Sequence, residues 1–419
     1  MRILVYNFHL TSDSYISWPS YYLLVLDQIK FIKELRHKAR FISSKDIGYP
    51  RSLKTLLDII SSPLPEIEEL QVILSEDTSP LAIPTDEWGF WNIPPPVPFD
   101  TKYQPLSEVN PEFLKEACSD STAVAVDSSW IEPDPHIDPP FALLNIGSFY
   151  VSYEKGEYIE DSIPILRIGN EVYVEKRGVK YLMTSADIDA WSFSEECKIA
   201  KSYASDTATL VLFDRSFSLS YLGSRSRDDR EYMLSLVEDE FSKMRPLKLV
   251  PIAVYFTRSR SIVNTLTRVY CSRVKSCSSC ILKLCKSVVE DKTLMSFVLR
   301  PGARSSIFIE HNKVLKKSIL EKKIAFFYLN TGYSILRVEF PTWVSKDKNL
   351  VQKIHRFILA QALMCKGYPY LMIRAHEKAV LRPEEREFVR EKILSIVSRE
   401  SGVKLSFSSK ALAKKRSIV

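Results

Sequence analysis

The sequence predicts an α/β fold in which a mixed sheet is flanked by helices. Short apolar runs typical of buried strands alternate along the chain with longer segments of helical periodicity. The chain has 419 residues, of which 45% are hydrophobic and 11% aromatic, which is enough for a sizeable core. We therefore expect a core of strands and helices that carries extensions or a second domain.

The N-terminal part of the chain predicts helices followed by a linker. Apolar residues at three-residue steps predict a helix over about 20–40, and a second helix is expected over 53–60. Prolines then accumulate between positions 80 and 105, a density that blocks regular structure and favours an extended polyproline-like segment. The predicted organisation is an N-terminal helical region over 1–78, a proline-rich linker over 79–115, the core over 116–402 and a basic tail over 403–419.

The core is expected to begin with strands and then to alternate helices with strands. Apolar runs predict strands at 122–126, 141–152, 163–168, 171–175, 180–184, 208–213, 248–256, 305–310, 323–329 and 333–340. Helical periodicity predicts helices at 186–205, 228–244, 260–298, 347–365 and 383–400. Segment 369–380 fits either a strand or the first turns of a helix.

Two aspartates each close an apolar run that we expect to be a buried strand. Asp127 follows 123–126, and Asp214 follows 209–213. Hard divalent cations such as Mg²⁺ and Mn²⁺ need several oxygen ligands at fixed distances, which strand ends supply better than loops. The alternative is that each aspartate only starts a turn or caps a helix, because Asp-Ser-Ser and Asp-Arg-Ser are ordinary sequences there.

A late segment makes the metal-site interpretation more specific. Residues 367–376 read Gly-Tyr-Pro-Tyr-Leu-Met-Ile-Arg-Ala-His. With the two aspartates, this segment resembles the NurA family, archaeal nucleases that process DNA ends together with the HerA translocase. The resemblance spans about 122–401 and includes the landmarks 301–306 and 337–341. The residues that match the family's site are Asp127, Glu196, Asp214, Tyr368 and His376.

The resemblance implies an RNase H-like core and metal-dependent hydrolysis of phosphodiesters with Mn²⁺ or Mg²⁺. Asp127 and Asp214 are the expected main ligands, and Glu196 completes the metal shell or orients the attacking water. His376 binds the metal or handles a proton, and Tyr368 contacts a phosphate or stacks on a base. His136, in the loop after the first core strand, is a minor alternative metal contact.

The chain departs from the family at two positions. The family usually has Asp-Gly-Ser after both strands, whereas Ser128 and Arg215 stand here in place of the glycines. Glycine allows close approach of the backbone to a ligand, so these replacements narrow or reshape the site. Arg215 either repels the metal or pairs with a substrate phosphate. Two interpretations follow, a retuned enzyme and a catalytically inactive scaffold subunit that binds DNA and the ATPase.

The net charge and the sequence motifs indicate which partners to expect. Lys and Arg number 58 against 51 acidic residues, and the net charge of +7 permits binding to DNA. The resemblance implies a homodimer that works in double-strand break repair with a hexameric HerA-like ATPase, and the chain carries no phosphate-binding loop of its own. An RNA-directed nuclease is a less favoured alternative. The candidate phosphate contacts are Arg215, Arg258, Arg300 and Arg304.

Four cysteines, Cys271, Cys277, Cys280 and Cys285, fall within a short stretch and invite a zinc or iron–sulfur interpretation. We favour buried thiols, because the stretch has helical periodicity and no glycine to fold four thiolates around an ion. A disulfide stays open for a hyperthermophilic source. No apolar run approaches the roughly 18 residues of a membrane span, and the start is too short for a signal peptide, so we expect a cytoplasmic protein.

Overall fold

The computed structural model describes residues 27–39, 51–74, 80–95, 111–274, 283–402 and 406–407. Contacts divide the chain into two units, Met1–Pro50 and Arg51–Val419. The first unit contains helix α1 (Gln28–Ala39), which falls within the helix predicted for 20–40. All other described elements belong to the second unit.

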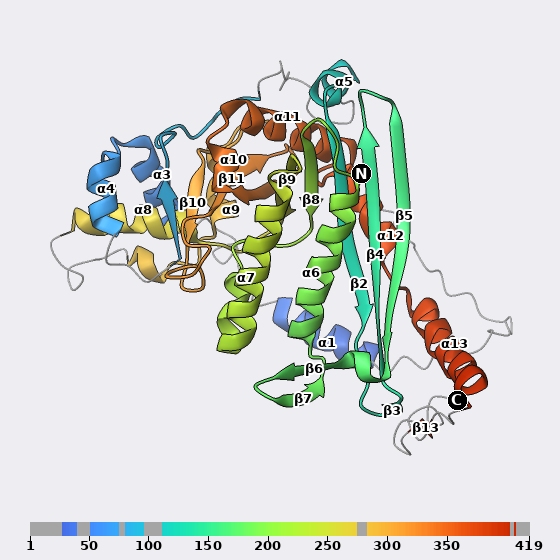
Figure 1. Cartoon of the computed structure of the whole chain (residues 1–419). Coiled ribbons are helices and arrows are strands. Elements are labelled where there is room, and N and C mark those ends of the chain that lie inside the picture. Colours follow the sequence, from blue (N-terminus) through green and yellow to red (C-terminus); the bar gives the residue numbers. More distant parts are fainter. Residues whose placement is uncertain are drawn as a thin grey trace, which may run out of the picture. The chain divides into compact units, whose positions relative to one another are not determined.

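A nine-stranded mixed sheet forms the centre of the second unit, with the strand order β1-β10-β11-β12-β9-β8-β2-β4-β5 (Figure 1). Its strands are β1 (Leu81–Pro84), β2 (Thr122–Ile131), β4 (Phe141–Ser152), β5 (Glu157–Ile168), β8 (Thr209–Phe213), β9 (Leu249–Tyr255), β10 (Phe308–His311), β11 (Ile324–Asn330) and β12 (Ile335–Pro341). Two short pairs lie outside it: β6 (Tyr173–Lys176) with β7 (Val179–Leu182), and β3 (Ile137–Asp138) with β13 (Ser406–Phe407).

Helices surround this sheet. They are α3 (Arg51–Ser61), α4 (Ile67–Leu74), α5 (Pro111–Cys118), α6 (Ser185–Ser202), α7 (Arg227–Met244), α8 (Ser261–Ser272), α9 (Asp291–Val298), α10 (Thr342–Ser345), α11 (Lys348–Met364), α12 (Tyr370–Ala379) and α13 (Pro383–Ser401). Segment 369–380, which the sequence left open, is therefore helical.

Five strands form the part of the sheet that carries the candidate site. Strands β2, β4 and β5 pair antiparallel as a meander, and β8 and β9 then continue the sheet in parallel with β2. Parallel neighbours need long crossover connections, and α6 and α7 provide them. This is the arrangement expected of an RNase H-like core, so the predicted fold class is confirmed. Beyond β9, strands β12, β11, β10 and β1 extend the sheet antiparallel.

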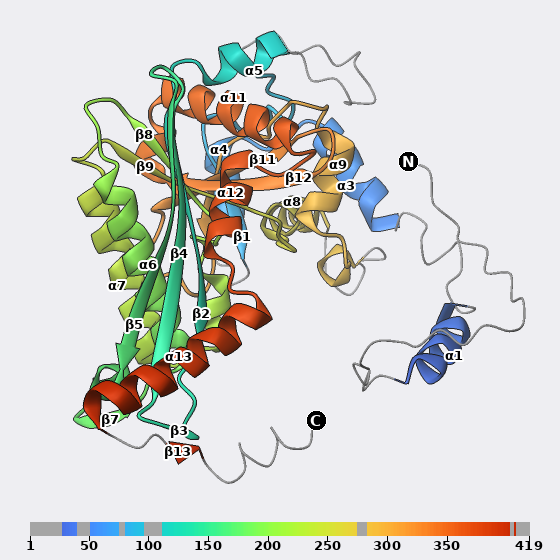
Figure 2. The same cartoon turned by 90° about the vertical axis from the view of Figure 1, so that its right-hand side faces the viewer.

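The two faces of the sheet are covered by different helices. Along β2, Ala123 and Ala125 pack with residues of α11 and α12, whereas Val124 and Val126 pack with residues of α6 and α7. Such alternation follows from the two-residue repeat of a strand. A third cluster joins α3, α4, α8 and α9 to β1, β10 and β11. Helix α13 packs through Ile393 on residues of β2, β3 and β4 (Figure 2).

The prediction of an extended linker over 79–115 is wrong for its first part, and also for its end, where residues 111–115 belong to helix α5. Residues 81–84 form β1 and pair with β10, and Trp91 is buried in the cluster shared with α3 and α8. Extended backbone of the kind that proline favours also suits an edge strand, and Pro84 ends this one. The N-terminal helices α3 and α4 therefore share a core with the sheet. Residues 96–110 lie outside the described residues, as do 403–405 and 408–419 of the predicted tail.

The single helix predicted over 260–298 is also wrong. The segment contains α8, a 3-10 turn at Leu284–Lys286 and α9, and Lys283 adopts a left-handed conformation with φ of 44° that no helix can continue through. Cys277 and Cys280 lie outside the described residues. Cys271 is half-buried and Cys285 is exposed, so the expectation of buried thiols is wrong for Cys285. Neither forms a disulfide with another described cysteine.

Candidate active site

Parallel pairing brings the two predicted aspartates side by side. Val126 of β2 pairs with Phe213 of β8, so Asp127 and Asp214 follow at the same end of neighbouring strands. Asp214 closes β8 as predicted. Asp127 does not close β2, because this strand continues to Ile131 through its pairing with β4. Only the parallel pairing of β2 with β8 ends here, and the carboxyl of Asp127 lies beside that of Asp214.

The two carboxyls influence each other electrostatically. Loss of water around the Asp214 carboxyl raises its pKa, and the negative charge of Asp127 raises it further. A hydrogen bond from Tyr368 and the nearby His376 act in the opposite direction. Two carboxylates held this close repel each other, and a divalent cation between them is the usual partner that relieves such repulsion.

His376 lies beside Asp127 on helix α12. Its Nδ1 is 2.7 Å from Asp127 Oδ2, and 60% of its side chain is exposed. The structure places the imidazole at the surface, with one nitrogen on the aspartate.

Gly147 allows α12 to approach the sheet at this point. It pairs with Asp127 across β2 and β4. A Cβ atom there would lie 2.1 Å from the carbonyl oxygen of Ala375 and 2.4 Å from the amide nitrogen of Ala379, both in the α12 backbone. Only glycine fits such an approach, so the contact between His376 and Asp127 depends on it.

The end of α12 is fixed by two polar side chains of the sheet. Asn145 Nδ2 donates to the carbonyls of Lys378 and Ala379 at 3.0 and 2.9 Å, and Ser129 Oγ donates to Ala379 at 2.6 Å. These are the last carbonyls of the helix, which have no partner within it. Ser129 also accepts a hydrogen bond from the amide of Leu381 at 3.1 Å. Neither Asn145 nor Ser129 is part of a motif that predicts this role from the sequence.

Tyr368 reaches the site from the residues just before α12. Its ring stacks on Phe256 with 5.5 Å between centroids, and its hydroxyl donates to the carbonyl of Val254 at 3.2 Å. The same hydroxyl is within hydrogen-bonding reach of the Asp214 carboxyl and lowers the pKa of that group. Tyr368 therefore holds its hydroxyl at the edge of the carboxylate pair.

Glu196 is buried on α6 and already has partners. Ser128 Oγ donates to its Oε1 at 2.5 Å, and Arg215 Nη2 lies 3.1 Å from Oε1 and 3.0 Å from Oε2. Burial raises the pKa of Glu196, while Arg215 and Ser128 lower it. The carboxylate is thus held by the two side chains that directly follow the aspartates.

Arg215 points into the protein toward α6. Only 16% of its side chain is exposed, and its guanidinium lies 3.1 Å from Ser192 Oγ, 3.7 Å from Asp189 Oδ1 and 4.9 Å from the centre of the Phe193 ring. The sequence left open whether this arginine repels a metal or meets a phosphate. In the structure its charge is directed at Glu196.

The loop after Asp214 is held by a buried carboxylate of β12. Glu339 accepts hydrogen bonds from the amides of Phe217 and Ser218 at 2.7 and 3.0 Å, and from the Tyr255 hydroxyl at 2.6 Å. Arg337 Nε donates to Glu339 at 2.7 Å and its guanidinium also pairs with buried Glu310. The sequence placed residues 337–341 among the landmarks without giving Glu339 this role.

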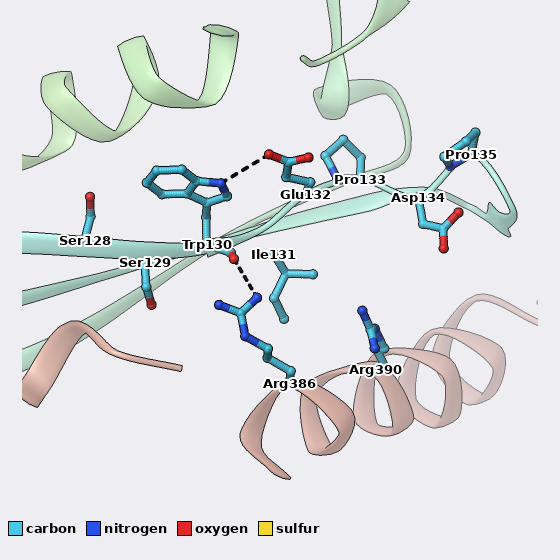
Figure 3. A pocket seen from close by; sticks show the side chains of 10 residues that line it. All are labelled: Ser128, Ser129, Trp130, Ile131, Glu132, Pro133, Asp134, Pro135, Arg386 and Arg390. Atoms are coloured by element: carbon cyan, nitrogen blue, oxygen red, sulfur yellow. Dashed lines mark hydrogen bonds between the residues drawn. The ribbon is translucent and has the colours of Figure 1, made fainter. Parts of the chain in front are cut away.

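A groove runs between the second half of β2, from Ser128 onward, and α13 (Figure 3). Its volume is about 690 Å³, and it is lined by residues 128–135 together with Arg386 and Arg390. Arg386 Nη1 donates to the carbonyl of Trp130 at 2.9 Å. These two arginines are not among the candidate phosphate contacts predicted from the sequence, although their four-residue spacing on a predicted helix places them on one face.

The remaining predicted contacts lie in different settings. Arg304 is buried and binds both carboxylate oxygens of Glu87 at 2.7 Å, so its guanidinium is occupied within the protein. Arg258 and Arg300 are exposed. His136 is exposed in the loop after β2.

The fit of a metal ion depends on which carboxylates are available. Within the part of the chain that the structure describes, no three His, Cys, Asp or Glu side chains form a ready-made metal cluster. Two of the predicted ligands already have partners within the protein, because Glu196 is bound by Arg215 and His376 is bound to Asp127. The oxygen donors of Asp127 and Asp214 suit a hard cation such as Mg²⁺ or Mn²⁺.

The fold and this site define an RNase H-like protein with paired strand-end carboxylates. The family model described as the NurA domain matches residues 121–381, which contain both aspartates, Glu196 and the late segment. The chain therefore belongs to the NurA family, a family of nucleases.

Solved structures match this chain at low sequence identity. A NurA crystal structure with manganese is 12% identical over 83% of this chain and 97% of its own, with a TM-score of 0.34. One of NurA bound to dAMP and manganese is 12% identical over 66% and 88%, with a TM-score of 0.29. No curated protein matches the sequence. None of the described helices combines the length and apolar character of a membrane span.

Proposed function

We propose that this chain is a divalent-metal-dependent deoxyribonuclease. The observation that carries the proposal is the placement of Asp127 and Asp214 at one end of neighbouring parallel strands, where the pKa of Asp214 is raised. Bound between them, Mn²⁺ or Mg²⁺ would neutralise the charge that develops on a phosphodiester and lower the pKa of a water molecule. Family membership supports hydrolysis of nucleic acid.

The other site residues have roles that follow from their contacts. Asp127 orients the imidazole of His376 through Nδ1, which leaves Nε2 to exchange a proton at the exposed side of the site. Tyr368 holds its hydroxyl next to Asp214, where its single hydrogen can turn from the carbonyl of Val254 to a phosphate oxygen. The amides of Phe217 and Ser218 are occupied by Glu339, so this loop serves to position Asp214.

The groove beside β2 is the path that we assign to the DNA strand. It starts at Ser128 and Ser129, next to the proposed cation position, and Arg390 lines it with a side chain that is 46% exposed. Contacts of this kind bind the phosphate backbone without reading sequence. Arg258 and Arg300 remain candidates for further phosphate contacts.

The biological setting comes from the family resemblance. We propose that the chain acts on DNA ends, as a homodimer, together with a hexameric HerA-like ATPase. The absence of a phosphate-binding loop from the sequence supports an ATPase on another polypeptide.

A digestion assay tests the enzymatic proposal. End-labelled single-stranded and duplex DNA is incubated with the full chain and Mn²⁺, with and without the ATPase, and RNA is run in parallel. We expect DNA cleavage that is lost with chelator and in the Asp127→Asn and Asp214→Asn variants. Asp239→Asn is the matched control, because Asp239 is an exposed residue whose ion pair is with Lys243 on its own helix.

A catalytically inactive scaffold is the second candidate function. It is favoured by one observation, the pairing of Glu196 with Arg215 in a position where the family has a glycine. If the wild-type chain cleaves no DNA with the ATPase present but still binds both partners, the scaffold is correct. Preferential cleavage of RNA would instead support the third alternative.

A further inference from the structure

Both residues that replace the family's glycines reach the same carboxylate. Ser128 follows Asp127 and Arg215 follows Asp214, and each lies within hydrogen-bonding distance of Glu196. The two positions are far apart in sequence, and Glu196 lies on a third element, α6. The contact of both side chains with one carboxylate accounts together for the two departures from the family's glycines. We call these three residues, Ser128, Glu196 and Arg215, the Glu196 clasp.

In the clasp, the Arg215 guanidinium lies against both oxygens of the Glu196 carboxylate, where a metal ion would otherwise bind. Oε1 accepts from Ser128 and Arg215, and Oε2 lies 3.0 Å from the same guanidinium. The side chain of Glu196 is only 4% exposed. A cation bound here would lie against a guanidinium that stays protonated in proteins. Repulsion between two positive charges in a site with little water opposes such binding.

Arg215 is also held in place from its other side. Ser192 accepts a hydrogen bond from Nη2, Asp189 lies 3.7 Å from Nη1, and the guanidinium packs over the ring of Phe193. These contacts all come from α6, the helix that carries Glu196. The guanidinium is therefore built into the site and is not a surface charge that can turn away.

We propose that this site binds a single divalent cation, at Asp127 and Asp214, and that the Arg215 guanidinium is a permanent positive charge in place of a second cation at Glu196. The inference rests on the proposed function only in that a cation binds at the two aspartates. It assigns Ser128 and Arg215 as positioning residues for Glu196.

The test counts manganese ions bound by the full chain. Isothermal titration with Mn²⁺ gives the stoichiometry, and electron paramagnetic resonance distinguishes isolated ions from spin-coupled pairs. We expect one isolated ion in the wild type and two coupled ions in Arg215→Gly, where Glu196 becomes available. The double variant Arg215→Gly with Glu196→Gln should return to one ion. Arg177→Gly is the matched control, because Arg177 is exposed and its φ of 53° suits glycine.

Each possible result supports or overturns a stated part of the proposal. Two coupled ions in the wild type overturn the single-ion site and leave the nuclease proposal standing. One ion in a folded Arg215→Gly variant overturns the role of the arginine. No bound ion in the wild type overturns both proposals. Circular dichroism checks that each variant folds, and the wild-type spectrum tests the single-ion site even when the glycine variant does not fold.

Discussion

Gly147 lies directly opposite Asp127 in the β2–β4 pair, and its missing side chain is what lets helix α12 lie against the sheet there. This close approach places His376 with its Nδ1 2.7 Å from Asp127 Oδ2. A residue without a side chain therefore determines the geometry of the candidate catalytic pair.

We expect Gly147→Ala to impair the site. Its methyl group would clash with the backbone of α12 near Ala375 and Ala379, and helix displacement should separate His376 from Asp127. Overpacking of this kind costs about 1–3 kcal/mol in the free energy of unfolding. Urea unfolding and the DNA digestion assay measure the two effects. Gly223→Ala is the control, because a Cβ there meets nothing closer than 3.9 Å; equal behaviour of the two variants would contradict the role of Gly147.

We expect His376→Ala to lose most of its DNA cleavage and to keep its metal binding. A positioned acid–base group contributes roughly 10²–10⁴-fold to a rate, so kcat should decrease by a factor in that range. Single-turnover cleavage and manganese titration separate the two properties. His136→Ala, which changes an exposed histidine of the loop after β2, should cleave normally. A His376→Ala variant with unchanged kcat would exclude its part in proton transfer.

The buried carboxylate of Glu339 should matter for stability as well as for the site. Glu339→Gln removes the negative charge that faces Arg337 and that accepts from the amides of Phe217 and Ser218. Loss of one partner of a buried ion pair costs about 3–5 kcal/mol, whereas an exposed pair contributes at most about 1 kcal/mol. Urea unfolding should therefore show a large loss for Glu339→Gln and a small one for Glu231→Gln, whose pair with Arg227 is exposed. Losses of equal size would argue against the network.

The raised pKa of Asp214 predicts a pH dependence of stability. The folded state binds this proton more tightly than the unfolded state, whose carboxyl has a pKa near 3.8. Protonation therefore favours folding, and the contribution of Asp214 to the free energy of unfolding falls as the pH rises above about 4. Asp214→Asn should gain stability relative to wild type as the pH is raised from about 4 towards neutral in buffer with chelator. A stability difference that stays constant over this range would show that the pKa is not raised.

The sequence predicted the parts of the site that depend on local pattern. Asp127 and Asp214 each follow an apolar run, and parallel pairing of those runs is enough to place them together. The inward direction of Arg215 was not predictable, because it depends on where α6 lies against β8. Gly147 was not found either, since its importance arises from strand register and from a helix more than 200 residues later.

The errors in the fold have equally local causes. Proline density suggested a linker, but β1 needs only four extended residues and an edge position, which the segment 81–84 provides. Helical periodicity over 260–298 concealed a break, because it does not register the left-handed backbone at Lys283. In both cases tertiary packing decided between conformations that the local pattern allowed.

The most direct test of the account is a crystal structure of the full chain with Mn²⁺, with the ion located by its anomalous scattering. We predict one anomalous peak between the carboxylates of Asp127 and Asp214, with Arg215 still paired to Glu196. If the crystal contains saturating Mn²⁺ and shows no peak at these aspartates, the result contradicts the claim that they form a metal-dependent hydrolytic site.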